Sequence, residues 1–179
     1  MYNPKGTDYG KEFIEIYHDP WINLENFTLS DSQKNKTLIA LNIINSSLYS
    51  VIMEDDSVLN ITNASIYTTG STIGYYGLNN DDKITLYNCK NSTNTSCFID
   101  SVAINSSIAN NNGRSLSKIN NTFYESLHIN GSPGKQNKYY IKPRIIFSLH
   151  KTQIFTGINY KNLFKIKIDK NDCSKKENI

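Results

Sequence analysis

The sequence has few of the residues on which many functional sites depend. It contains three cysteines, three histidines, four prolines and one tryptophan in 179 residues. The cysteines form no Cys-x-x-Cys pair and no zinc-type Cys/His spacing, so we expect no metal site. No apolar run approaches the roughly 18 residues of a membrane-spanning helix. The opening MYNPKGTDYG has no basic region followed by an apolar one, so it is not typical of a signal peptide.

Recognisable catalytic patterns are also missing. None of the histidines His18, His128 and His150 lies in a nucleophile context. Glu12 and Glu15 have opposite strand parity, so the two carboxylates project to opposite faces and cannot act on one bond together. GSTIGYYG lacks the lysine and spacing of a phosphate-binding loop. We expect no enzyme activity and no cofactor.

What is present indicates a folded β protein. Hydrophobic residues make up 38% of the chain and aromatic residues 11%, which is enough for a core. Short runs with a period of two, such as EFIEIY, KITLY, FIDSVAI and LFKIKI, recur between clusters of Gly, Asn, Asp and Ser. Many short strands at this spacing predict an all-β fold, either a sandwich or a barrel.

Asparagine is abundant, with 25 residues, and many of these begin an Asn-x-Ser/Thr triplet. Such triplets accept glycans in chains that pass through a glycosylating compartment. An AT-rich genome is the alternative explanation, because it raises Asn, Lys and Ile together. The excess favours an extracellular or cell-surface glycoprotein. The ten candidate acceptors are Asn26, Asn35, Asn45, Asn60, Asn63, Asn91, Asn94, Asn105, Asn120 and Asn130.

Two of the cysteines are placed as if to close a hairpin. Cys89 and Cys97 bracket the loop KNSTNTS between two strand-like segments. A disulfide across the base of such a loop is geometrically reasonable. Cys173 is left over, and we expect its partner in sequence beyond this chain. A disulfide is typical of an oxidising compartment, which agrees with an extracellular location.

Charge divides the chain into two parts. Residues 1–134 hold 8 Lys/Arg and 13 Asp/Glu, a net charge of −5, whereas residues 135–179 hold 11 and 3, a net charge of +8. The change directly follows Gly131–Gly134 and predicts a boundary between a domain of residues 1–137 and a segment of residues 138–179. The lysines of residues 135–179 lie within strand-like segments. This placement favours lysines on the solvent-exposed faces of strands. Binding of nucleic acid or another anionic polymer by residues 135–179 is the alternative.

The order of the motifs resembles a known family. The segments MYNPKGTDYGKEFIEIYHD, NLENFTLSDS, GLNNDDKITLYN, FIDSVAI, NNGRSLSKIN and NGSPGKQN follow one another over about residues 1–137. Together they resemble the lamin-tail domain of prokaryotic surface and secreted proteins. That resemblance implies an immunoglobulin-like β-sandwich for residues 1–137. The text of residues 138–179 resembles the first strands of a second, truncated sandwich module.

Two departures from the family pattern matter. Phe13 and Phe27 stand where the family usually has tryptophan. The strand text INEV that normally precedes this start is missing, so the resemblance predicts a clipped first strand. The edge left behind could be filled by another strand or support self-association.

A few side chains carry more specific predictions. Asp100 shares strand parity with Phe98 and Val102, so we expect it to point towards an apolar layer, where a carboxylate must be paired. Its predicted partners are backbone amides of a neighbouring turn or Arg114, and such a pairing would lock the structure locally.

Trp21, Tyr75 and Tyr76 lie in segments that read as loops or strand ends. Core or rim packing is the favoured role for these aromatics, and exposed ligand contact is the alternative.

The sequence therefore predicts a non-catalytic extracellular module with a structural, adhesive or binding role, and a protein or cell-envelope component as its partner. By resemblance, such domains also accompany secreted hydrolases or nucleases, so a targeting domain for a catalytic part outside this chain is the second hypothesis. Weak binding of nucleic acid through residues 135–179 is the third. Fold alone does not choose among them.

Overall fold

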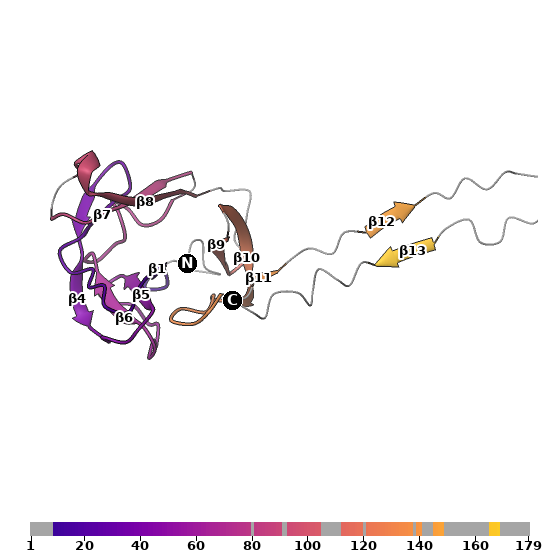
Figure 1. Cartoon of the computed structure of the whole chain (residues 1–179), viewed down its shortest axis with the longest axis horizontal. Helices are drawn as coiled ribbons and strands as arrows, with labels where there is room; N and C mark the ends of the chain where they lie inside the picture. The colour runs from indigo at the N-terminus through magenta and orange to yellow at the C-terminus, as the bar shows by residue number, and fades with distance from the viewer. Residues whose placement is uncertain are drawn as a thin grey trace, which may run out of the picture. The chain divides into compact units, whose positions relative to one another are not determined.

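The chain consists almost entirely of β structure. The computed structural model describes residues 9–79, 81–90, 93–104, 112–119 and 121–137, together with short strands at 139–140, 145–148 and 165–168. The only helix in these ranges is a 3-10 turn, η1 (Thr95–Cys97). Figure 1 shows the strands of the first part as curved layers. The all-β prediction is confirmed.

One four-stranded sheet, called sheet A, has the order β1-β5-β6-β4. Its strands are β1 (Phe13–Tyr17), β5 (Tyr49–Met53), β6 (Ser65–Thr68) and β4 (Ile39–Asn42). β1 pairs antiparallel with β5, and β4 pairs antiparallel with β6. β5 and β6 run parallel, joined by a crossover. β1 therefore lies at an edge of sheet A.

A second four-stranded sheet, sheet B, has the order β3-β2-β7-β8 and is antiparallel throughout. Its strands are β3 (Asn35–Thr37), β2 (Thr28–Ser30), β7 (Lys83–Tyr87) and β8 (Phe98–Ala103). The register between β7 and β8 shifts between Leu86, opposite Asp100, and Tyr87, opposite Phe98. This bulge places Asp100 and Phe98 on different faces of the sheet, because each strand alternates its faces along the ladder.

A smaller sheet follows, in the order β11-β10-β9. β9 (Arg114–Ile119) and β10 (Thr122–Ile129) form an antiparallel hairpin, and β11 (Tyr139–Tyr140) pairs with β10. The contacts within the chain divide it into units of residues 1–140 and 141–179. In the second unit, β12 (Ile145–Ser148) pairs antiparallel with β13 (Lys165–Ile168). The domain boundary after residue 137 stays a prediction.

Sheets A and B pack as a sandwich, which agrees with the predicted immunoglobulin-like class. Ile52 and Tyr67 are fully buried on sheet A, and Leu29 and Leu86 face them from sheet B. Burial of each large apolar side chain contributes about 1.5 to 3 kcal/mol. The hydroxyl of Tyr67 donates to Asn23 Oδ1 at 2.9 Å and accepts from the Leu24 amide at 3.0 Å, so its polar atom is satisfied in the core.

The outer face of sheet A carries a second apolar cluster. Phe13, Val51 and Met53 pack there with Ile61 and Ala64 from the crossover between β5 and β6. The Gly134 backbone lies against this cluster, because a Cβ at that position would stand 3.2 Å from Ile61 Cγ2. The glycine-containing segment that ends the predicted first domain therefore packs onto sheet A.

Buried carboxylates hold several loops, a feature that the sequence did not predict. Glu54 Oε2 accepts from the Gly10 amide at 2.6 Å, and Glu12 Oε2 accepts from the Leu78 amide at 2.9 Å. Asp31 Oδ1 accepts from the amides of Gln33 and Lys34 at 2.9 and 2.6 Å. All three carboxylates are buried. Backbone amides supply the partners that a buried carboxylate requires.

Candidate functional site

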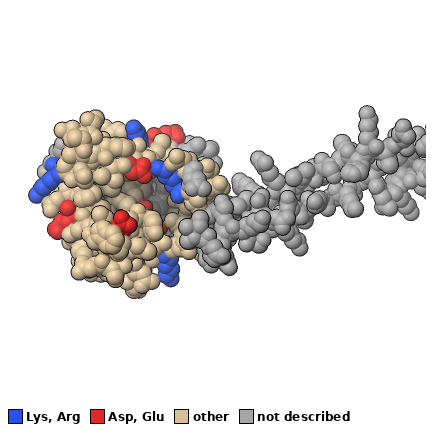
Figure 2. Space-filling view, viewed as in Figure 1, with Lys and Arg blue, Asp and Glu red and all other residues tan. Residues whose placement is uncertain are grey.

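A cleft of about 450 Å³ is lined by all five residues of β1, which ends sheet A among the described strands. Side chains from both faces of β1 line it, including Ile14 and Ile16 from the inner face and Glu15 from the outer face. Residues of β8 and β9 form the opposite wall. Figure 2 shows this side of the first unit hollowed near its centre, with acidic and basic side chains at the margin.

Three sheet edges meet at this cleft. β1 ends sheet A, β8 ends sheet B, and β9 ends the small sheet, and each pairs on only one side with another described strand. An edge strand presents backbone amides and carbonyls that another extended chain can pair with. The predicted loss of a strand before residue 1 stays a prediction, because residues 1–8 lie outside the described residues.

The walls of the cleft are mainly apolar. Val102 on β8, Leu116 on β9 and Phe123 on β10 line it together with Ile14 and Ile16 of β1. Several of these side chains pack only at the margin of the inner core, where they are half-buried. A mostly apolar cleft with a few polar groups is the usual form of a binding site.

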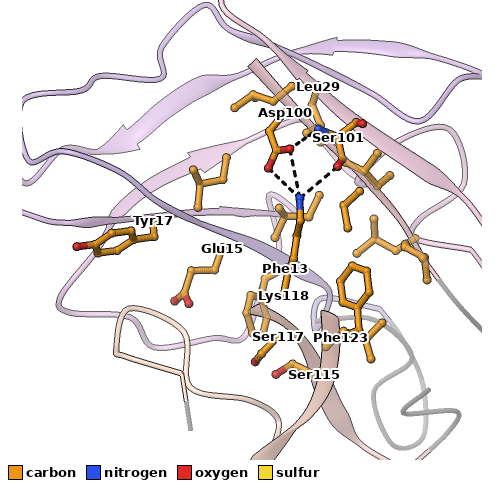
Figure 3. Close-up of a pocket in the computed structure, with 18 of the residues that line it drawn as sticks. Phe13, Glu15, Tyr17, Leu29, Asp100, Ser101, Ser115, Ser117, Lys118 and Phe123 are labelled. Carbon is orange, nitrogen blue, oxygen red and sulfur yellow. Dashed lines mark hydrogen bonds and ion pairs between the residues drawn. The ribbon is translucent and has the colours of Figure 1, made fainter. Parts of the chain in front are cut away.

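An ion pair spans the cleft wall between β8 and β9. Lys118 Nζ lies 3.3 Å from Asp100 Oδ1 and Oδ2 and donates to the Ser101 carbonyl at 3.5 Å. The Ser101 amide in turn donates to Asp100 Oδ1 at 2.8 Å. Figure 3 shows these three residues joined by dashed lines above the cleft. The two side chains thus occupy the backbone donor and acceptor of Ser101 on the β8 edge.

The predicted role of Asp100 is wrong in two respects. Asp100 does share a face with Val102, yet its side chain is 68% exposed, because that face opens into the cleft at the edge of the sheet. Its partner is Lys118, not Arg114. An exposed ion pair of this kind contributes about 0 to 1 kcal/mol, so Asp100 is not the structural lock that the sequence predicted.

Arg114 stabilises a different feature. Its guanidinium donates to the carbonyls of Ser126 and Leu127 at 2.7 and 2.5 Å. These carbonyls lie where the β9–β10 register shifts, between Glu125 and Ile129. A bulge leaves ladder groups unpaired, and Arg114 supplies donors to two of them.

Two serines of β9 lie at the floor of the cleft in Figure 3. Ser115 and Ser117 are both buried. The Ser115 amide donates to Ser126 Oγ at 3.0 Å. Ser117 Oγ is the one buried side-chain oxygen of the described residues without a hydrogen-bond partner. An unpartnered buried hydroxyl is costly, so Ser117 Oγ lowers the stability of this part of the fold.

Glu15 carries the other carboxylate of the site. Its Oε2 accepts from the Gly134 amide at 2.6 Å, and its Oε1 accepts from Asn137 Nδ2 at 3.1 Å. Burial raises the pKa of Glu15 above its ordinary value, although these two hydrogen bonds oppose the rise. Glu12 is buried, and its Oε2 accepts from the Leu78 amide, so the two glutamates have separate partners.

A serine–histidine contact, which the sequence did not predict, lies beside β1. His18 Nε2 is 2.7 Å from Ser50 Oγ, and His18 Nδ1 is 2.6 Å from the Asp19 carbonyl. Ser50 is fully buried, so no substrate carbonyl can reach its hydroxyl. The pair therefore ties the loop after β1 to β5.

No group of three His, Cys, Asp or Glu side chains that could hold a metal occurs among the residues described.

The predicted disulfide is present. Cys89 and Cys97 are bonded, with 5.8 Å between their Cα atoms, and Cys97 ends η1 directly before β8. Cys173 lies outside the described residues.

The described asparagines of the Asn-x-Ser/Thr triplets are all exposed: Asn26, Asn35, Asn45, Asn60, Asn63, Asn94 and Asn130. Asn91, Asn105 and Asn120 lie outside the described residues.

The three candidate contact aromatics are exposed, contrary to the favoured prediction of core or rim packing. Trp21 is 75% exposed, Tyr76 71% and Tyr75 41%. The alternative role as exposed ligand contacts is thereby strengthened for these side chains.

The strands of the basic segment 135–179 are described only by their backbone, so its predicted binding of anionic polymers stays a prediction.

The comparisons with known proteins add no relative. No family model, curated protein or solved structure matches the chain. The resemblance to the lamin-tail family therefore stays a prediction. Within the described ranges, no helix is long and apolar enough to cross a membrane.

Proposed function

We propose that this chain is a non-catalytic, extracellular module of a surface or secreted protein, and that it binds a protein partner at the cleft along β1. The observation that carries the proposal is the meeting of three sheet edges at one apolar cleft. The disulfide and the exposed sequon asparagines support an extracellular location.

The partner that fits this cleft is an extended segment that adds to β1. Backbone pairing with an edge strand supplies affinity, and alternate side chains supply specificity. Of the three edges, β8 already has the donor and acceptor of Ser101 occupied by Asp100 and Lys118. β1 offers five residues, and apolar side chains from the opposite wall can cover a strand placed beside it.

A second copy of the same chain is a poorer partner than a different protein. Antiparallel pairing of two β1 strands about their centre would set Glu15 opposite Glu15 of the other copy. Like charges directly opposite each other destabilise a strand pair. The proposed partner is therefore a segment of another envelope protein, with apolar residues at alternate positions.

A displayed library of nine-residue peptides tests the proposal. We expect enrichment of peptides with alternating apolar residues, and loss of their binding by about tenfold or more in Ile99→Lys, which places a charge in the cleft wall. Ile99 is half-exposed, so this variant should fold. Ile129→Lys is the matched control, because Ile129 is also exposed but does not line the cleft. Equal binding by both variants, or no enrichment at all, would contradict the proposal.

A further inference from the structure

The loop of residues 69–79, between β6 and β7, displays two adjacent tyrosines. Tyr75 and Tyr76 are 41% and 71% exposed. Their ring centroids lie 4.0 Å apart, with an angle of 56° between the rings. Large aromatic side chains in an exposed pair form a typical contact surface for a ligand.

Apolar side chains on both sides of the pair anchor this loop. Ile73 is fully buried and Leu78 is buried, and both belong to the inner core of the sandwich. The chain therefore enters the core, leaves it for the two tyrosines and returns within six residues. Each anchor limits the movement of the exposed segment between them.

Buried carboxylates fix the same segment through its backbone. The Tyr75 amide donates to Asp31 Oδ2 at 2.5 Å, and the Leu78 amide donates to Glu12 Oε2 at 2.9 Å. Gly74 and Gly77 have φ angles of +74° and +95°, and a Cβ at either would collide with one of these carboxylates. The tyrosines are thus held in place before any ligand arrives, which lowers the entropic cost of binding.

Cationic and polar groups border the tyrosines. Lys34 Nζ lies 5.5 Å from the centroid of the Tyr75 ring. The turn that contains Lys34 also borders a shallow depression of about 410 Å³ on sheet B. Its lining includes Ser32, Gln33 and Lys83, and no acidic residue among those described. We call Tyr75, Tyr76, Lys34 and this depression the tyrosine–lysine surface.

We propose that the tyrosine–lysine surface binds an acidic polysaccharide. The C–H groups on the face of a sugar ring carry partial positive charge and pack against the negative face of an aromatic ring. Carboxylates along the polymer can pair with Lys34 and Lys83, and sugar hydroxyls can bond to the serine and amide side chains of the depression.

The charge of the module favours a saccharide over a nucleic acid. Residues 1–134 carry a net charge of −5, which repels a polymer with one phosphate on every nucleotide. A polysaccharide that alternates charged and neutral sugars has a lower charge density, so the same net charge repels it less. This surface is separate from the cleft along β1, and its proposal does not depend on partner binding there.

The test is a titration of the full chain with fragments of hyaluronan at about 50 and 200 mM salt, with dextran as the neutral polymer and a single-stranded oligonucleotide as the other polyanion. We expect hyaluronan to bind, and Tyr76→Ala to weaken it by about tenfold or more. Lys34→Gln should weaken binding and reduce its dependence on salt. Tyr9→Ala is the matched control, because Tyr9 is 70% exposed but belongs to neither lining.

Each other outcome overturns the assignment. Absence of hyaluronan binding would contradict it, as would equal binding by Tyr76→Ala and the unaltered chain. Tighter binding of the oligonucleotide, lost in the same variants, would assign the surface to nucleic acid instead. If dextran bound as tightly as hyaluronan, the lysines would have no role in recognising the polymer. All three substituted residues are at the surface, so an unchanged melting temperature should show that each variant is folded.

Discussion

The loop of residues 69–79 and the cleft along β1 satisfy their backbone polar groups in opposite ways. In the loop, buried carboxylates of Asp31 and Glu12 accept the amides of Tyr75 and Leu78. At the cleft, β1 and β9 each pair on one side only with another strand of the described residues, and Ser117 Oγ has no hydrogen-bond partner among them. The loop is therefore built for rigidity, whereas the cleft retains capacity for a partner. This difference separates residues that should matter for stability from residues that should matter for binding.

Gly74→Ala should cause the largest loss of stability. The new Cβ would collide with the Asp31 carboxylate, at a backbone φ of +74° that alanine adopts only with strain. We expect a loss of about 4 kcal/mol in the free energy of unfolding, measured by urea denaturation. Gly70→Ala is the control, because its φ is also positive but its nearest neighbour, Lys36 Nζ, lies 3.9 Å away. Equal losses in both variants would show that the carboxylate contact does not matter.

Asp31→Ala should cost nearly as much, and Asp100→Ala almost nothing. Loss of the Asp31 carboxylate leaves the amides of Gln33, Lys34 and Tyr75 without their acceptor, at a cost of about 3 kcal/mol. Asp100 is exposed and pairs only across the surface, so we expect a change below about 1 kcal/mol. Thermal melting of the two variants side by side measures the contrast. The reverse order would contradict the assignment of the two carboxylates.

Ser117→Ala should leave stability unchanged or raise it by about 0.5 to 1 kcal/mol, because the substitution removes a buried hydroxyl without a partner. Ser126→Ala is the matched comparison. Ser126 Oγ accepts from the Ser115 amide and donates to the His128 carbonyl at 2.7 Å, so its loss should destabilise the hairpin. Denaturation midpoints decide the matter, and a clear loss in Ser117→Ala would mean that its hydroxyl has a partner.

The smallest expected effect is a pH dependence at Glu15. Burial raises its pKa in the folded chain above the ordinary value of 4.5, so the folded state binds this proton more tightly than the unfolded state. Stability from this group should therefore fall as pH rises from about 4.5 through the raised pKa. Melting temperatures between pH 4 and 8 should show a smaller fall in Glu15→Gln. A larger fall in that variant would contradict the direction of the shift.

The period-two pattern was sufficient to predict the all-β class, and facing strand ends were sufficient to predict the Cys89–Cys97 bond. Both depend on local alternation, which the sequence displays directly. The role of Asp100 was mispredicted because an inward-facing position on an edge strand can still be open to solvent. The bulge affected only Phe98, which lies on the other face.

The carboxylate anchors could not be predicted because they join distant parts of the chain. Asp31 and Tyr75 are 44 residues apart, and Glu12 and Leu78 are 66 apart. The glycines of TTGSTIGYYGL were recognised only as turn formers. Their close approach to carboxylates requires the packed fold.

Amide hydrogen exchange of the full chain, alone and with a saturating library-derived peptide, tests the role of the cleft most directly. A strand added to β1 must give its outward amides new hydrogen-bond partners. We predict slower exchange in Phe13–Tyr17 on peptide addition, with no change at Tyr75 and Tyr76. A peptide that binds while exchange in β1 stays the same would contradict the proposed strand addition.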